Sequence, residues 1–290
     1  MDDADATVPE RRTTRDIRTP VVFVSLGSSL ALTDQEYELS LRRLGHQIGR
    51  PRAIIALSSD WQCTRPIRVT ASEHPSTLED FDAGLSSLVV RPHRYPGSPG
   101  IAAEIVELLA AEGLPASLDR SHGLGFGVWM PAAVMFPTAV VPVVQISQPD
   151  ASTPDDMLAV GRALVPLRRR GVLLMGSGGS VCDPWVERSM GSQRTADPRA
   201  VAFDAWVRAR LDDLDIETLR DYRRAAPQAY VAAPTSRYLD ALFFVLGSHL
   251  PGDRILHVHE GFHAGNLSLR ACLLVGRRKD DGRIVEAEGA

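Results

Sequence analysis

The stretch VVFVSLGSSLAL, residues 21–32, decides the fold that the sequence predicts. Five of the six residues before Gly27 are apolar, which is typical of a parallel strand covered on both faces. The small residues Gly27, Ser28 and Ser29 allow a tight turn at the carboxyl end of that strand. In open α/β sheets, ligands bind at this end of the strands. Leu26 is unusual there, because its side chain carries no polar group.

Strand-like and helix-like segments alternate along the rest of the chain. The expected strands cover 20–26, 52–58, 66–71, 141–147, 171–176, 254–259 and a last one near 266–276, and the expected helices cover 34–48, 99–112, 154–170, 198–213 and 236–248. This alternation predicts one α/β domain over residues 20–276, with a mixed, mostly parallel central sheet flanked by helices. Residues 1–19 and 277–290 are polar, and we expect disordered or flexible ends there.

Composition narrows the function classes. The chain has 290 residues, is 44% hydrophobic and carries a net charge of −4, which predicts a large core and no basic surface for nucleic acid or membrane. No apolar stretch approaches the roughly 20 residues that span a bilayer. The three cysteines, Cys63, Cys182 and Cys272, are far apart, so we expect a reducing cytoplasm rather than disulfides or structural zinc.

Eight segments, in order, resemble the DOPA 4,5-dioxygenase type of class III extradiol ring-cleaving dioxygenases. Among them are RPRAIIALSSDWQ, GFGVWMPAAVMFP, GVLLMGSGGSVCD and EGFHAGNLSLR, and the resemblance covers residues 20–276. It implies a non-haem iron, sometimes zinc, held by histidines at strand ends, and opening of catechol rings with dioxygen. The family motifs HGSP, SAHW, DHG and SGNxxHN stand here as LGSS, SSDW, GFG and SGGSVCD, and a family His-Tyr pair stands as Arg-Tyr.

The positions at which the resemblance implies a histidine hold Leu26, Asp60, Phe126, Cys182 and Arg237. Leucine and phenylalanine cannot bind a metal, and arginine keeps its proton at accessible pH. We therefore expect no metal and no cofactor at these positions. If Asp60 and Arg237 both point into the former metal site, they form either a structural ion pair or a catalytic pair. In the catalytic pair, Arg237 binds a substrate carboxylate and Asp60 acts as a base.

Further candidates surround these positions. Cys182 lies in a Gly/Ser-rich loop, where it is either a thiol nucleophile or a buried cysteine, and His122 lies four residues before Phe126. The expected catalytic set is Asp60, Cys182, Arg237 and His122, and the expected substrate-binding set is Leu26, Ser28, Trp61, Phe126, Trp129, Asp183 and His263. In HVHEGFH, alternation places His257 and His259 on one strand face, so with His263 they form either a relocated metal site or structural histidines.

Three functions stay open at this point. The first is a metal-independent descendant of the scaffold, which acts on a small aromatic or carboxylated metabolite by non-oxidative acid–base chemistry in specialised metabolism. The second is a non-catalytic partner subunit of a ring-cleaving dioxygenase, and the third is residual ring-opening activity. The expected partners are a small aromatic ligand and either identical copies or a related subunit.

Overall fold

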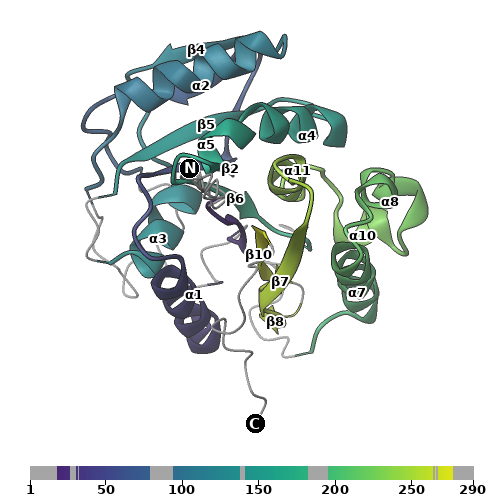
Figure 1. Ribbon diagram of the computed structural model, residues 1–290. Coiled ribbons are helices and arrows are strands. Elements are labelled where there is room, and N and C mark those ends of the chain that lie inside the picture. The colour runs from purple at the N-terminus through teal and green to yellow at the C-terminus, as the bar shows by residue number, and fades with distance from the viewer. Residues whose placement is uncertain are drawn as a thin grey trace, which may run out of the picture.

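The computed structural model describes residues 18–26, 31, 33–78, 94–137, 141–181, 195–263, 265 and 267–276. Its centre is an eight-stranded sheet with the order β4-β3-β5-β2-β6-β1-β10-β7 (Figure 1). The strands are β1 (Val21–Ser25), β2 (Ala53–Cys63), β3 (Ile67–Thr70), β4 (Ala116–Asp119), β5 (Val143–Pro149), β6 (Val172–Gly178), β7 (Asp253–His259) and β10 (Ala271–Gly276). Strands β5, β2, β6 and β1 run parallel. At one edge, β10 pairs antiparallel with β1, and β7 pairs antiparallel with β10. The expected mixed, mostly parallel sheet is confirmed.

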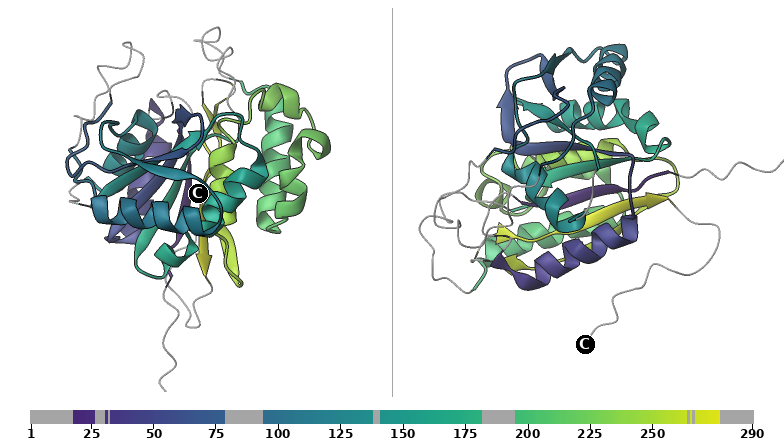
Figure 2. Two further views of the ribbon diagram at one scale, coloured as in Figure 1. Left: turned by 90° about the horizontal axis from the view of Figure 1, so that it is seen from above. Right: turned by 90° about the vertical axis from the view of Figure 1, so that its left-hand side faces the viewer.

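Helices cover both faces of this sheet. Helices α1 (Gln35–Ile48) and α3 (Phe126–Met135) pack on one face, where they share an apolar cluster with β1 and β2. The other face is covered by α2 (Pro99–Ala111), α4 (Pro154–Ala163), α5 (Val165–Arg168), α7 (Pro198–Asp212) and α11 (Asp240–Gly247). The short helices α8 (Ile216–Arg220), α9 (Tyr222–Ala225) and α10 (Ala229–Ala232) follow α7, and Figures 1 and 2 show this group on one side of the molecule. None of the described helices is long and apolar enough to cross a bilayer.

Helix ends follow local chemistry. Helix α1 begins after Asp34, whose side chain accepts a hydrogen bond from the Tyr37 N–H at 3.0 Å. The helix starts one residue later than the expected range 34–48. Helix α4 begins after Thr153, whose side chain accepts a hydrogen bond from the Asp156 N–H at 3.2 Å. The expected helix 154–170 divides into α4 and α5. Pro166 lies in the first turn of α5 and has no N–H, so it cannot continue the backbone hydrogen bonds of α4.

Helix α3 is absent from the sequence-based expectation. All residues from Gly127 to Met135 are buried, so the segment shows no polar stripe with a helical period. This helix matters for the site, because its first turn meets the end of β2.

Candidate functional site

The end of β2 is the point at which residues from distant segments meet. Three consecutive residues there contact three different parts of the chain. The Ser59 carbonyl accepts a hydrogen bond from the Arg237 Nε, and the Asp60 carboxylate contacts the first turn of α3. The Trp61 ring stacks on the His122 ring, with centroids 3.9 Å apart and 9° between the planes. The structure thus brings several predicted site residues to one strand end, which we call the β2-end site.

Asp60 caps α3. Its Oδ2 accepts the Gly127 N–H at 2.8 Å, and its Oδ1 accepts the Gln145 Nε2 at 3.1 Å. Gln145 in turn accepts the Gly125 N–H at 2.8 Å. A Cβ at Gly125 would lie 2.3 Å from Asp60 Oδ2, so the close approach requires glycine. The carboxylate therefore occupies the positive end of a helix dipole, where negative charge is stabilised.

Arg237 does not pair with Asp60. Its guanidinium lies 5.6 Å from the centroid of the Tyr238 ring while its Nε donates to the Ser59 carbonyl. Among the described residues, no ion pair joins the two side chains. The conditional expectation of an ion pair at this strand end is therefore not met, because backbone and amide donors hold the carboxylate instead. Arg237 is half-buried and its charge faces the same strand end.

Of the apolar residues expected to bind substrate, some lie in the hydrophobic core and others lie at the β2-end site. Leu26 is 5% exposed, and its N–H donates to the Gly178 carbonyl, which fixes the end of β1 beside β6. Trp129 is 1% exposed and its Nε1 donates to the Leu78 carbonyl at 2.9 Å, so its ring belongs to the core. Phe126 is half-buried and meets Trp129 edge-on, with centroids 5.5 Å apart. Phe126 and Trp61 are thus the aromatic side chains at the β2 end.

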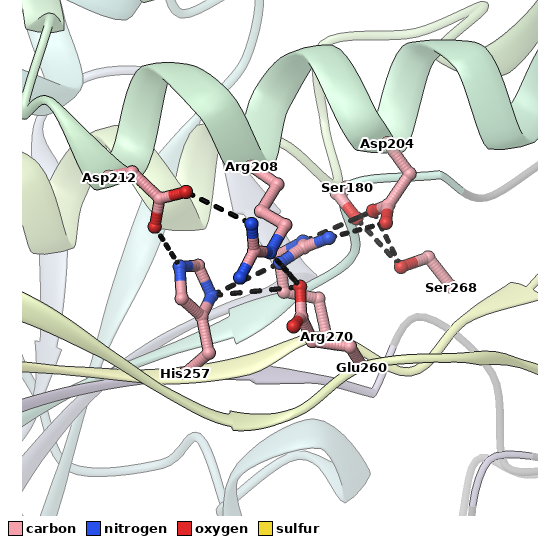
Figure 3. Close-up of polar contacts among 8 residues, drawn as sticks. All are labelled: Ser180, Asp204, Arg208, Asp212, His257, Glu260, Ser268 and Arg270. Carbon is pink, nitrogen blue, oxygen red and sulfur yellow. Dashed lines mark hydrogen bonds and ion pairs between the residues drawn. The ribbon is translucent and has the colours of Figure 1, made fainter.

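The three histidines of HVHEGFH point to three different places. His257 Nε2 lies 2.8 Å from Asp212 Oδ1 on α7 (Figure 3). His259 Nδ1 lies 3.1 Å from Ser40 Oγ on α1. His263, in the short strand β8 (Phe262–His263), contacts Thr33 through Nε2 at 2.7 Å.

The expectation that His257 and His259 share a face is wrong. Cys272 is the register partner of His257, whereas the adjacent Ala271 is the partner of His259. Strand β7 therefore carries one extra residue at this step, a β-bulge, which breaks the alternation of side chains. The relocated metal site that the alternation suggested does not assemble from these histidines.

In the part of the chain that the structure describes, the donors do not fit the iron that the resemblance implies. Leu26 and Phe126 have no lone pair, and the Arg237 guanidinium is a cation. Asp60 already accepts two hydrogen bonds. Within the described ranges, no group of three or more His, Cys, Asp or Glu side chains could hold a metal ion. The candidates Ser28, Cys182 and Asp183 lie outside the described residues, so their roles stay predictions.

Sequence reasoning missed the residues that hold Asp60 in place. Gln145 is a buried polar residue inside the apolar strand VPVVQIS, and that contrast was the available signal. Gly127 gave no comparable signal in the sequence. In the structure, a Cβ at this position would lie 2.3 Å from Ser58 Oγ and 3.3 Å from Ser177 Oγ, so the close packing requires glycine. The Ser177 hydroxyl is buried and has no hydrogen-bond partner among the described residues.

A family comparison agrees with this architecture. Residues 23–257 match the family described as the catalytic LigB subunit of aromatic ring-opening dioxygenase. The chain belongs to the LigB family. This result confirms the resemblance to class III extradiol dioxygenases, and it leaves open which chemistry this LigB-family member performs.

Individual relatives cover most of the chain. A 4,5-DOPA dioxygenase extradiol of Escherichia coli (strain K12) is 32% identical over 257 residues, which are 87% of this chain and 93% of that protein. One from Mirabilis jalapa is 30% identical over 220 residues, or 76% and 81%. The crystal structure of an uncharacterized Escherichia coli K12 protein has a TM-score of 0.72 at 29% identity and covers 89% of this chain and all of the other. The LigB-family chain therefore shares its scaffold with dioxygenases along nearly its full described length.

Proposed function

We propose that this LigB-family protein works without a metal, binds a small aromatic carboxylate at the β2-end site and moves protons rather than activating dioxygen. One observation carries the proposal: Asp60 accepts hydrogen bonds from the Gly127 N–H and the Gln145 amide at a position where the resemblance implies a metal ligand. A carboxylate that neutral donors and a helix end already stabilise needs no metal ion beside it.

The proposal gives each group at the β2 end a role. Arg237 is the cation that receives the ligand carboxylate, because a guanidinium forms two parallel hydrogen bonds with it. Trp61 and Phe126 offer aromatic surface to the ring. His122 is the imidazole that takes and returns a proton. Asp60 positions α3, and its contacts favour this role over that of a base.

Two further parts of the proposal concern the setting. Cys63 and Cys272 are free thiols, which supports a reducing, cytoplasmic environment. The relatives named for DOPA suggest an aromatic amino acid as the ligand class, since DOPA has both an aromatic ring and a carboxylate. A role in specialised metabolism belongs to the same proposal.

Titration calorimetry with L-DOPA under nitrogen tests the proposal. Protein treated with a chelator should bind L-DOPA with the same dissociation constant before and after addition of ferrous ion. Arg237→Gln should weaken binding about 10- to 100-fold, because a hydrogen bond to a charged group contributes about 1.5–3 kcal/mol. Arg254→Gln, at an exposed arginine of β7, is the matched control and should leave binding unchanged. Binding that requires iron, or iron-dependent oxygen uptake with a ring-opened product, would overturn the proposal.

A non-catalytic subunit is the second candidate. The burial of Leu26 in an apolar cluster favours it, because a packed side chain at a position where the resemblance implies a metal ligand leaves less room for a ligand. Light scattering of the chain expressed alone separates the two functions. A stable, monodisperse protein that binds L-DOPA supports the enzyme, whereas aggregation relieved by a co-expressed LigB-family chain supports the subunit.

A further inference from the structure

Three polar side chains form a constellation that the proposed function does not use. Thr33 Oγ1 lies 2.7 Å from His263 Nε2, and Asp34 Oδ2 lies 3.5 Å from His263 Nδ1. A hydroxyl, an imidazole and a carboxylate in this order are the parts of an activated oxygen nucleophile. We propose that Thr33 is the nucleophile of an acyl-transfer site for small activated esters, with His263 as general base and Asp34 as the carboxylate that orients it.

Secondary structure holds two of the three groups, Asp34 and His263. Asp34 is the cap of α1, and its Oδ1 accepts the Tyr37 N–H, while its Oδ2 faces the imidazole. His263 lies in β8, where it pairs with Leu267 of the short strand β9 (Leu267–Ser268). The nucleophile and the orienting carboxylate thus come from one helix start, and the base comes from a facing hairpin. Such supports fix the mutual geometry that a nucleophile and its base need.

Exposure and charge also suit the chemistry. The side chains of His263 and Asp34 are 26% and 27% exposed, and Thr33 itself is only half-buried, so the three groups lie at the surface where an ester in solution could approach. Thr33 directly precedes the cap of a 14-residue helix. The positive end of the helix dipole therefore lies where negative charge would develop on the ester oxygen during attack.

The step balances without a redox partner. Thr33 Oγ forms a bond to the acyl carbon as its proton passes to His263 Nε2, and the bond from that carbon to the leaving oxygen breaks. The imidazolium gives the proton to the leaving oxygen. Water then attacks the acyl carbon, His263 takes its proton, and the proton returns to Thr33 Oγ as the acyl–oxygen bond breaks.

A second hydroxyl–imidazole pair in the same region provides the matched control. Ser40 Oγ lies 3.1 Å from His259 Nδ1, and the Tyr37 ring lies edge-on to that imidazole at 5.1 Å. Burial lowers the pKa of His259, and no described carboxylate lies within ion-pair distance of its ring. Ser40 therefore has a base but no orienting carboxylate, and we expect it to stay unreactive.

Acetylation by p-nitrophenyl acetate, followed by mass spectrometry, tests the assignment. Lys279 is the single lysine of the chain, so competing amine acetylation is confined to two places, this residue and the N-terminus. The tryptic peptide 19–42 contains both Thr33 and Ser40, and one fragment spectrum compares them. We expect the acetyl group on Thr33, with a burst of p-nitrophenolate equal to the amount of acetylated protein.

Variants assign the roles. Thr33→Ala should abolish the adduct, and Thr33→Ser should keep or increase its rate of formation because a primary hydroxyl is less hindered. His263→Gln should slow acetylation at least about 100-fold, the usual contribution of a general base. Asp34→Asn keeps the helix cap and should slow acetylation about 10-fold or more. Ser40→Ala should have no effect.

Acetyl groups spread equally over Thr33, Ser40 and Lys279 would overturn the assignment. An unchanged rate of acetylation in His263→Gln would also overturn the assignment, provided that this variant melts at the wild-type temperature. If His263→Gln melts lower, the rate in Asp34→Asn decides instead. The β2-end proposal is tested separately, because L-DOPA binding does not depend on acetylation of Thr33. If acetylation of Thr33 fails, the proposal for L-DOPA binding still stands, and the reverse holds as well.

Discussion

Two buried carboxylates on the helices behind the sheet are held in opposite ways. Asp204 on α7 contacts the Arg270 guanidinium through both oxygens, and its Oδ1 also accepts from Ser180 and Ser268 (Figure 3). Asp240 at the start of α11 accepts hydrogen bonds from two neutral groups, Gln148 Nε2 at 2.7 Å and Ser152 Oγ at 2.9 Å. Asp204 therefore forms a direct ion pair, whereas the described hydrogen-bond donors to Asp240 are all neutral.

The two carboxylates have different roles. Asp204 holds two segments together, and we call it the anchor, whereas Asp240 changes its protonation with pH. The Asp204–Arg270 pair joins α7 to the segment before β10, and the Arg270 carbonyl accepts the Ser25 N–H at the end of β1. This pair therefore fixes both the helix and the strand end. Burial instead raises the pKa of Asp240 to about 6, with partial compensation by the hydroxyl and amide donors and by the charge of Arg223.

The largest effect should follow from breaking the anchor. Asp204→Ala leaves the Arg270 charge buried without its main partner and should lower the free energy of unfolding by about 3–5 kcal/mol. Urea unfolding measures the change. The control is Glu38→Ala, which removes an exposed pair with Arg42 on α1 and should cost about 0.5 kcal/mol or less. Equal losses in the two variants would show that Asp204 is no anchor.

A smaller effect should come from titration of Asp240. Because its folded pKa lies above the unfolded value of 3.8, the folded state binds the proton more tightly. The contribution of this group to stability is greatest below pH 4 and is lost as the pH rises from about 4 to 6. Asp240→Asn removes this dependence and keeps an acceptor for Gln148 and Ser152.

We expect Asp240→Asn to be more stable than the wild type at pH 8 by about 1–3 kcal/mol, since each unit of pKa shift corresponds to about 1.4 kcal/mol. The advantage should shrink toward pH 4. Thermal melts of both proteins between pH 4 and 8 measure this difference. Parallel curves across that range would contradict the raised pKa of Asp240.

The contrast between local and distant contacts explains what the sequence could predict. The alternation of segments predicted every strand of the central sheet except β4, and the helices α1, α2, α4, α7 and α11. The Thr153 cap is a contact within one turn. Helix α3 escaped prediction because it is apolar on all sides. The hydrogen-bond partners of Asp60 were not predicted either, because Gly127 and Gln145 are 67 and 85 residues away from it in the sequence.

Strand geometry hid the remaining features. The bulge in β7 separates His257 from His259, and its signal lies in the pairing with β10 rather than in β7 itself. The Thr33–His263 contact joins residues 230 positions apart, and no spacing rule connects them. Residue types thus indicated where chemistry could occur, and the tertiary contacts decided which groups meet.

The smallest effect should come from the exposed end of the same α7 network. Asp212 is 42% exposed as a side chain, and it bridges His257 and Arg208 (Figure 3). Water screens these contacts, so Asp212→Asn should cost only about 0.5–1 kcal/mol in urea unfolding, and 1 M salt should remove most of that loss. The Asp204→Ala loss should persist in 1 M salt, because a buried pair is screened much less. If salt reduced both losses alike, the division of this network into a buried anchor and a solvated end would be wrong.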